Sequence, residues 1–249
     1  MKFYPEYTEL VSPCTSVGIS CVYLLVTYLL YSLMRNREAF KLNYLMKIYN
    51  FGQVLLNIYM IYGLSVNVGT ADVTLFENKL NVFNFFRINE SYNAGIEWFM
   101  FVHYLSKILD FFDTIFICLR KSDRQLSFLH IYHHSSILLV WGFVLHMDHG
   151  NGTASYGAWI NSIIHLIMYT HYFVSSFGID NPYKKYITSM QIYQFYTCII
   201  HFCIVYAYEK LYPIEYAYMQ PLYHMTMITL FTAFYKKSYS EKQPKQDTE

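Results

Sequence analysis

Charged residues are scarce in this chain: 14% of its 249 residues are Asp, Glu, Lys or Arg, against roughly a quarter in soluble domains. The formal net charge of +1 gives no indication of a nucleic-acid partner. The five cysteines show no CxxC spacing, so the sequence predicts neither a disulfide framework nor a zinc site. No stretch has the alternating strands and glycine-rich turns of an α/β enzyme. These absences argue against a soluble domain.

The chain instead contains long apolar segments. Hydrophobic residues make up 55% of the chain and aromatic residues 20%, and a helix needs about 20 residues to span a bilayer. The expected spans are 15–34, 44–66, 96–118, 127–147, 155–177, 187–208 and 217–235. We therefore predict an all-α, polytopic fold in which residues 1–249 form a single integral membrane domain. The polar tail from about 236 to 249 is predicted to be disordered.

The basic residues predict the orientation, because Lys and Arg favour cytoplasmic loops. Thirteen of the 18 fall in one alternate set of connecting segments, namely 35–47, 120–124, 184–185 and the tail. The opposite set holds four, so the N-terminus is expected outside the cytoplasm and the C-terminus within it. Two glycosylation sequons, Asn89-Glu-Ser91 and Asn151-Gly-Thr153, then fall on the non-cytoplasmic side.

Three histidines stand together at the start of the fourth span. His130, His133 and His134 occupy positions i, i+3 and i+4, so on a helix they project from one face. An imidazole can ligate a metal, transfer protons near neutral pH or attack an acyl group. A simpler interpretation is that these side chains cap the helix and bond to backbone and lipid headgroups. Because polar groups also cluster on neighbouring spans, we favour a reaction site.

The third span carries a polar stripe. Its members within about 60° of arc are His103, Lys107, Asp110 and Thr114, with Asp113 about 60° beyond Asp110. A charge at bilayer depth costs at least about 2.5–3.5 kcal/mol unless it is paired or hydrated. The stripe is therefore expected to face an enclosed site. The alternative is a Lys107–Asp110 pair that only joins helices, which leaves Asp113 without a role.

The fifth and sixth spans add further polar groups. His165, Tyr169 and Tyr172 share one face of the fifth span. In the sixth span, Gln191 and Gln194 lie three residues apart and can bond a substrate carbonyl or amide. They can equally join helices in lipid. Polar groups that point inward from four spans fit a reaction chamber better than a purely structural bundle.

Four motifs in these spans resemble, in order, those of the ELO family, the fatty acid elongases of the endoplasmic reticulum. The segments are Lys107 to Thr114, similar to K-x-x-E-x-x-D-T; Ser127 to His134, similar to S-F-L-H-x-x-H-H; Asn161 to Tyr172, similar to N-S-x-x-H-x-x-M-Y-x-Y-Y; and Thr188 to Gln194, similar to T-x-x-Q-x-x-Q. Asp110 stands where the family usually has Glu, which is one methylene longer. His171 stands where the family usually has Tyr, and it points about 120° away from His165.

The resemblance implies a seven-helix protein of the endoplasmic reticulum membrane, with its N-terminus in the lumen and six helices around a narrow acyl-chain tunnel. It implies condensation of a long-chain acyl-CoA with malonyl-CoA to a 3-oxoacyl-CoA two carbons longer, with release of carbon dioxide and CoA and with no cofactor or metal. CoA is expected to enter from the cytoplasmic side, where Arg120 and Lys121 suit its phosphates. The expected partners are the lipid bilayer and the reductases and dehydratase of the elongation cycle; a homodimer is left open.

With no well-placed cysteine, an imidazole is the available nucleophile. We expect His133 to carry the acyl group and His165, on the antiparallel neighbouring span, to position malonyl-CoA and promote decarboxylation; the reverse assignment is left open. His130 and His134 are expected to tune protonation and to donate to the enolate. The expected substrate-binding residues are Lys107, Asp110, Asp113, Tyr169, Tyr172, Gln191, Gln194, Arg120 and Lys121.

Other functions stay open on the residues alone. A membrane di-iron desaturase or hydroxylase also uses H-x-x-H-H, but it needs several histidine boxes and this chain has one. A non-enzymatic lipid receptor or transporter would not need clustered titratable groups. A condensing enzyme with a cysteine nucleophile would depend on Cys118, Cys198 or Cys203. The acyl chain length that the protein prefers does not follow from the sequence.

Overall fold

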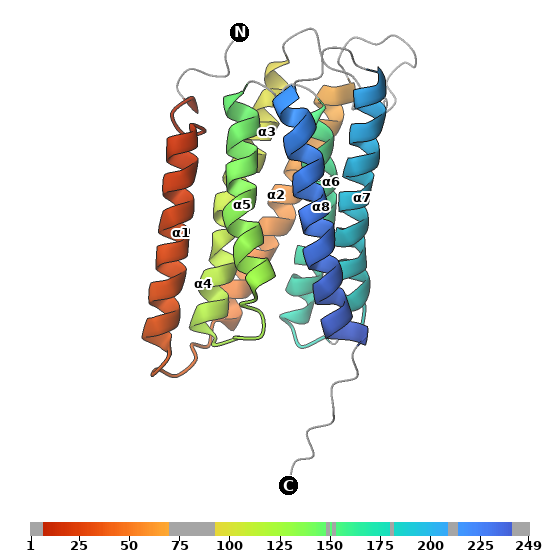
Figure 1. Cartoon of the computed structure of the whole chain (residues 1–249). Coiled ribbons are helices and arrows are strands. Elements are labelled where there is room, and N and C mark those ends of the chain that lie inside the picture. The colour runs from red at the N-terminus through yellow and green to blue at the C-terminus, as the bar shows by residue number, and fades with distance from the viewer. Residues whose placement is uncertain are drawn as a thin grey trace.

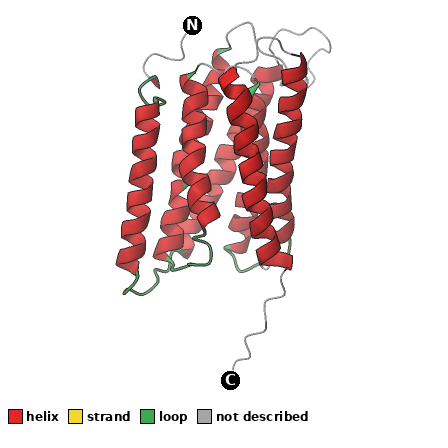
Figure 2. Ribbon diagram, in the orientation of Figure 1, coloured by secondary structure: helices red, strands yellow, loops and turns green. Residues whose placement is uncertain are grey.

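The computed structural model describes residues 7–69, 93–147, 150, 153–179, 182–208 and 214–240. Within these ranges the fold is all-α, as predicted, and no strand occurs (Figure 2). The elements are α1 (Pro13–Met34), α2 (Asn43–Gly69), α3 (Ala94–Leu109), α4 (Phe111–Leu119), α5 (Phe128–His146), α6 (Ala154–Ser175), α7 (Lys184–Tyr208), α8 (Ile214–Tyr235) and the π-helical turn η3 (Lys236–Ser240). Because α3 and α4 together form the third span, the prediction of seven helical spans is confirmed.

Capping residues determine where two of the helices begin. Ser12 precedes α1, and its side chain accepts a hydrogen bond from the Thr15 N–H (3.2 Å). Pro13 follows at the first helical position, where an amide hydrogen would have no helical partner. Ser127 caps α5 in the same way by accepting from the His130 N–H (3.2 Å). This second cap fixes the histidine run in the first turns of α5.

The third span is interrupted at Asp110, which separates α3 from α4. Asp110 keeps right-handed helical angles (φ −61°, ψ −15°), and its N–H still bonds the Ser106 carbonyl (2.9 Å). The expectation of one continuous helix over 96–118 is therefore wrong at this point. Neither proline nor glycine marks the break in the sequence. The Asp110 side chain is instead held by groups from other helices, which local sequence does not reveal.

Six of the seven described rods form a closed ring, and α1 lies outside it (Figure 1). Around the ring, α5 packs on α8, α8 on α7, α7 on α6, α6 on α2, α2 on α3, and α3 on α5. Helix α1 packs against α4 and α5 from outside. This order brings together segments far apart in sequence, above all α2 and α6.

Helix α1 is attached to the ring by hydroxyl groups. Its buried residues are Ser16, Ser20, Tyr23, Thr27 and Met34. Ser16 Oγ lies 3.2 Å from the Tyr104 hydroxyl, and Ser20 donates to the Ser135 carbonyl (3.1 Å). A Cβ atom at Gly142 of α5 would collide with the Ser16 side chain, so the two helices approach closely. Small residues and interhelical hydrogen bonds are the usual means of packing helices in lipid.

Four described helices are long and apolar enough to cross a membrane: α1, α5 and the greater part of α2 and α7. Of the remaining rods, α3 and α4 are short because of the break at Asp110, while α6 and α8 do not reach the same apolarity. All seven rods run alongside one another (Figure 1). The three other rods therefore cross together with these four, and the chain is a multi-pass membrane protein.

The connections that carry basic residues gather at one end of the bundle (Figure 1). This end holds the α1–α2, α4–α5 and α6–α7 connections and the end of α8. Lys121 Nζ donates to the carbonyls of Arg35 (3.3 Å) and Arg37 (3.1 Å), which joins two of these connections. The start of α1 lies at the opposite end. The sequon residues Asn89 and Asn151 lie outside the described residues.

The expected polar tail begins with ordered backbone. Helix α8 passes into η3, which ends at Ser240. Residues 241–249 lie outside the described part of the chain. Disorder of that remaining segment stays a prediction.

Candidate functional site

A buried polar cluster surrounds Asp110 where α2, α3, α4 and α6 meet. Asp110 Oδ2 accepts a hydrogen bond from Lys107 Nζ (3.3 Å), and Oδ1 accepts from Gln53 Nε2 (3.1 Å). Asp110 and Lys107 are each only 2% exposed. His103 and Thr114 are buried as well, so the polar stripe of the third span faces the protein interior, as expected.

The Tyr169 hydroxyl joins two carboxyl groups of this cluster. It lies 3.0 Å from Asp110 Oδ1 and 2.6 Å from Asp113 Oδ2. A phenol has one proton, so the two carboxyl groups compete for it. Tyr172, expected on the same inward face, is 40% exposed and meets the Tyr169 ring edge-on (centroids 6.0 Å apart). The expectation of a shared inward face is therefore wrong for Tyr172, which lies in the last turn of α6.

Asn161 connects the cluster to a cavity. Its Oδ1 accepts from Lys107 Nζ (2.9 Å), and its side chain lines the cavity. One turn further along α6, His165 Nδ1 lies 3.8 Å from Asp110 Oδ2. This separation is too long for a hydrogen bond, but it places the carboxylate beside the imidazole ring. Asp110 thus stands between the Lys107 ammonium and the His165 imidazole.

The three histidines of α5 contact side chains, not backbone. His130 Nε2 lies 2.8 Å from Thr114 Oγ1. The His134 ring lies 4.3 Å from that of His130 and 5.5 Å from that of His133, centroid to centroid. The Nδ1 atoms of His133 and His134 are buried and have no hydrogen-bond partner among the described residues. Since Ser127 supplies the helix cap, the interpretation of the imidazoles as caps is not supported.

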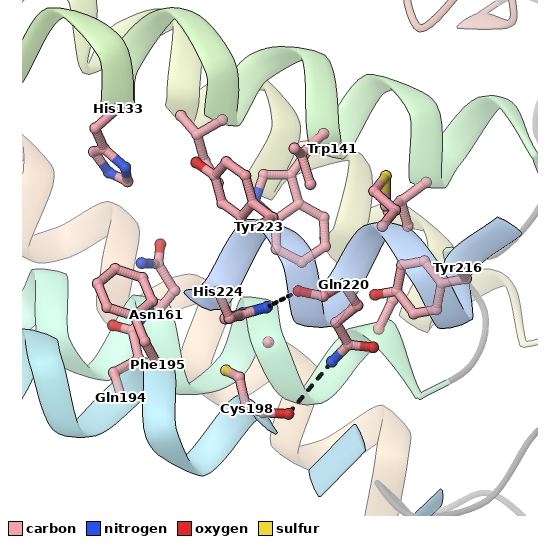
Figure 3. A pocket seen from close by; sticks show the side chains of 16 residues that line it. His133, Trp141, Asn161, Gln194, Phe195, Cys198, Tyr216, Gln220, Tyr223 and His224 are labelled. Atoms are coloured by element: carbon pink, nitrogen blue, oxygen red, sulfur yellow. Dashed lines mark hydrogen bonds between the residues drawn. The ribbon is translucent and has the colours of Figure 1, made fainter. Parts of the chain in front are cut away.

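The cavity lies between α5, α6, α7 and α8 (Figure 3). At one end His133 of α5 lies across from Asn161 of α6 and Gln194 of α7 (Figure 3). Trp141 and Tyr216 line it further along. Six helices form the ring, but four of them line this cavity, because α2 and α3 contribute the polar cluster instead.

The two glutamines of α7 differ in position. Gln194 is buried and lines the cavity. Gln191 is outside the cavity lining, and its Nε2 lies 3.5 Å from Met168 Sδ on α6. A helix-joining role therefore suits Gln191, while Gln194 can reach a ligand.

The basic residues after α4 lie at the end of the bundle where α5 starts. Arg120 is half-buried, and its Nη1 lies 3.1 Å from Met46 Sδ on α2. Lys121 is exposed, and it adopts the left-handed backbone region (φ 53°) while its ammonium binds the two carbonyls of the α1–α2 connection. Both cations belong to the short connection that leads from α4 to α5.

Sequence reasoning missed the contribution of α2. Gln53 donates to the Tyr49 hydroxyl (2.9 Å) as well as to Asp110, and the Tyr49 hydroxyl lies 3.5 Å from that of Tyr169. Asn57 donates to the Gln53 carbonyl (2.8 Å), and Asn50, Gln53 and Asn57 are each at most 3% exposed. The signal was present, because these polar residues recur at i, i+3 and i+7 in an apolar span.

Neither cysteine chemistry nor a metal site stands out. Cys118 and Cys198 are buried, Cys203 is exposed, and of these Cys198 lines the cavity. Among the described residues, no three His, Cys, Asp or Glu side chains are grouped so that they could hold a metal ion. The cavity therefore presents imidazole and amide groups as its principal polar side chains.

Comparison with known proteins agrees with this arrangement. The model of the ELO: GNS1/SUR4 family matches residues 8–247. Fatty acid elongase 5 of Leishmania major is 42% identical over 94% of this chain and 89% of its own length. Very long chain fatty acid elongase 5 of Rattus norvegicus is 35% identical over 90% of this chain and 73% of its own length.

The ring of helices, its buried charged cluster and its histidine-lined cavity define a multi-pass membrane enzyme. The family match, which covers residues 8–247, identifies the kind of enzyme. The chain belongs to the ELO family, and it is a fatty acid elongase. The desaturase and receptor interpretations of the sequence are thereby excluded.

Proposed function

We propose that this elongase condenses an acyl-CoA with malonyl-CoA by histidine chemistry in the cavity. It is a very-long-chain 3-oxoacyl-CoA synthase, whose product is two carbons longer than its substrate and whose by-products are carbon dioxide and CoA. His133 carries the acyl group. His165 positions the malonyl group and promotes its decarboxylation.

One observation supports this assignment above the others. His133 lines the cavity across from Asn161 and Gln194, and its buried Nδ1 has no partner among the described residues (Figure 3). An unpartnered ring nitrogen beside a cavity can attack an acyl carbon or accept a proton. His165 lies outside the cavity lining and close to a carboxylate. A carboxylate beside an imidazole suits an orienting group better than a nucleophile.

The reaction proceeds in two stages. The free ring nitrogen of His133 attacks the thioester carbon; the carbon–sulfur bond breaks, and the departing CoA thiolate takes up the proton that the other ring nitrogen of His133 gives up, which leaves a neutral acyl-imidazole. Malonyl-CoA then loses carbon dioxide, and the electron pair of the broken bond forms an enolate. The enolate carbon attacks the acyl-imidazole, and the bond to His133 breaks. Donors at the developing oxyanions lower both barriers.

Other residues take supporting roles. His130 and His134 tune protonation and donate to the enolate oxygen. Lys107, Asp110, Asp113 and Tyr169 fix the side of the chamber that bears His165. Gln194 orients the substrate carbonyl. Arg120 and Lys121 bind CoA phosphates at the cytosolic mouth, where cations suit phosphate oxygens.

The cellular setting follows from the same activity. The elongase resides in the endoplasmic reticulum membrane with its N-terminus in the lumen and its C-terminus in the cytosol, so that cytosolic CoA esters reach the basic end of the bundle. Separate reductases and a dehydratase process the 3-oxo product.

Incubation with acyl-CoA alone tests the covalent stage. We expect stoichiometric release of free CoA and an acyl adduct on the intact protein by mass spectrometry, located on His133 by peptide mapping. The His133→Ala variant should give neither, while His146→Ala, at the far end of α5, should give both. If the enzyme elongates normally but releases CoA only when malonyl-CoA is present, the enolate attacks the acyl-CoA thioester directly. The histidines then act as acid, base and oxyanion donors.

A further inference from the structure

A chain of hydroxyl groups connects the outer helix α1 to the histidine run. The Tyr23 hydroxyl lies 3.0 Å from Thr114 Oγ1, and Thr114 Oγ1 lies 2.8 Å from His130 Nε2. The three residues come from α1, α4 and α5. Tyr23, which lies outside the six-helix ring, therefore reaches a proposed catalytic histidine through a single intermediate.

The geometry of this chain is well restrained. Tyr23 is 5% exposed and Thr114 is 1% exposed, so bulk solvent does not compete for their hydroxyls. The Tyr23 ring stacks on Phe111, with centroids 4.2 Å apart and planes at 24°. Because that stacking fixes the ring, the direction of the hydroxyl is fixed as well.

The hydroxyl protons allow the chain two directions, since His130 Nε2 can either accept from Thr114 or donate to it. Thr114 has one hydroxyl proton, and when it donates to His130 Nε2 its oxygen must accept from Tyr23. A neutral imidazole whose Nε2 accepts carries its proton on Nδ1. The structure gives His130 Nδ1 no hydrogen-bond partner among the described residues. That N–H is then free to donate.

We propose that Tyr23 is a positioning residue: through Thr114, it holds His130 in the tautomer that presents Nδ1–H as a donor to the enolate oxygen. The proposal rests on the histidine-based function above. It assigns to α1, which forms no part of the ring, an influence on the chemical step.

The competing explanation is that Tyr23 only anchors α1. The helix has other anchors that do not touch the histidines, which supply matched controls. Tyr104 donates to the Leu10 carbonyl (2.9 Å) and contacts Ser16 of α1 (3.2 Å). Tyr104→Phe thus removes one buried phenol oxygen at the α1 contact, as Tyr23→Phe does, but leaves the His130 chain intact.

The test is a double-mutant cycle on the full-length enzyme in detergent, with rates normalised to folded protein. We expect Tyr23→Phe to lower kcat by about three- to tenfold, the range of a single hydrogen bond, with KM for acyl-CoA unchanged. Thr114→Val should lower kcat at least as much, and Thr114→Ser, which keeps the hydroxyl, should restore it. Adding Tyr23→Phe to Thr114→Val should cause no further loss, because Tyr23 acts only through Thr114.

Tyr104→Phe should leave kcat unchanged. If it fails to fold, Ser20→Ala, which removes the bond to the Ser135 carbonyl, replaces it as the α1 control. The proposal is overturned if Tyr23→Phe has a normal kcat, if the losses in kcat add in the double variant, or if the α1 control loses as much kcat as Tyr23→Phe. His133→Ala separates a failure of the histidine mechanism from a failure of the Tyr23 proposal. If His133→Ala elongates normally, the histidine mechanism is wrong. If His133→Ala is inactive and Tyr23→Phe has a normal kcat, only the positioning role of Tyr23 is wrong.

Discussion

Replacing Lys107 with methionine tests whether the buried cluster serves catalysis or only packing. Lys107 Nζ contacts Asp110 (3.3 Å) and Asn161 (2.9 Å) and is almost fully buried. Methionine keeps the apolar stem but removes the charge, which leaves Asp110 without its contacting ammonium. Removing one partner of a buried ion pair costs about 3–5 kcal/mol. At about 2–4 °C per kcal/mol for a chain of this size, the Tm should fall by about 10 °C.

The double variant Lys107→Met/Asp110→Asn separates the two roles. It leaves no uncompensated charge on the pair, and neutral replacement of a buried ion pair is often close to neutral for stability. We therefore expect most of the Tm to return. Elongation should not return, because an amide at position 110 has no negative charge to orient the His165 imidazole, which lies 3.8 Å away.

Two measurements on the purified enzyme decide the question: thermal unfolding followed by intrinsic fluorescence, and incorporation of labelled malonyl-CoA per folded molecule. The control is Lys185→Met, the same change at an exposed position, which should alter neither. Recovery of both Tm and elongation in the double variant would reduce the cluster to a structural element. A single variant as stable as the parent would refute the burial argument itself.

Two shorter predictions concern orientation and the aromatic face of α6. A tag placed after Glu249 should be cleaved by protease added to intact microsomes; protection would invert the topology and place the histidine end away from cytosolic CoA. Tyr169→Phe, which removes a donor to two carboxyl groups, should cost about 1.5–3 kcal/mol and most of the activity, whereas exposed Tyr172→Phe should stay within about 0.5 kcal/mol; equal effects in thermal unfolding and turnover would contradict the assignment.

The helical spans were accessible from sequence because each rod needs its own apolar run. The ends of all seven spans, with α3 and α4 taken together as the third, agree with the prediction to within three residues. The break at Asp110 was not predictable, since it coincides with bonds from Gln53 and Tyr169 on other helices. The ring order was equally hidden, because apolar periodicity does not say which rods are neighbours. Helices α5 and α6 face each other across the cavity, with α3 in contact with both, and the expectation that His133 and His165 approach one thioester from opposite sides stays a prediction.

The candidate site was predictable where a charged residue stood inside an apolar span, because such a residue needs a buried partner. Lys107 and Asp110 inside an apolar span required a buried partner, and each has one. The reasoning failed where it assigned a direction from helical angle alone, as for Tyr172, or overlooked amides such as Gln53 that lie outside any motif. The angle of 100° per residue indicates which residues share one side of a helix. The packing of neighbouring helices determines whether that side is buried.

The scaffold and the site of this protein share residues, and the membrane is the reason. Lipid tails are as apolar as leucine, so burial of apolar surface contributes little to helix association in the membrane. Polar contacts and close packing stabilise the association instead. The bonds that join α1 to α4 and α2 to α3 and α6 run through Thr114, Gln53 and Tyr169. Each of these also touches His130 or Asp110. A variant there changes helix association and chemistry together, which is why stability and turnover must be measured on the same sample before either role is assigned.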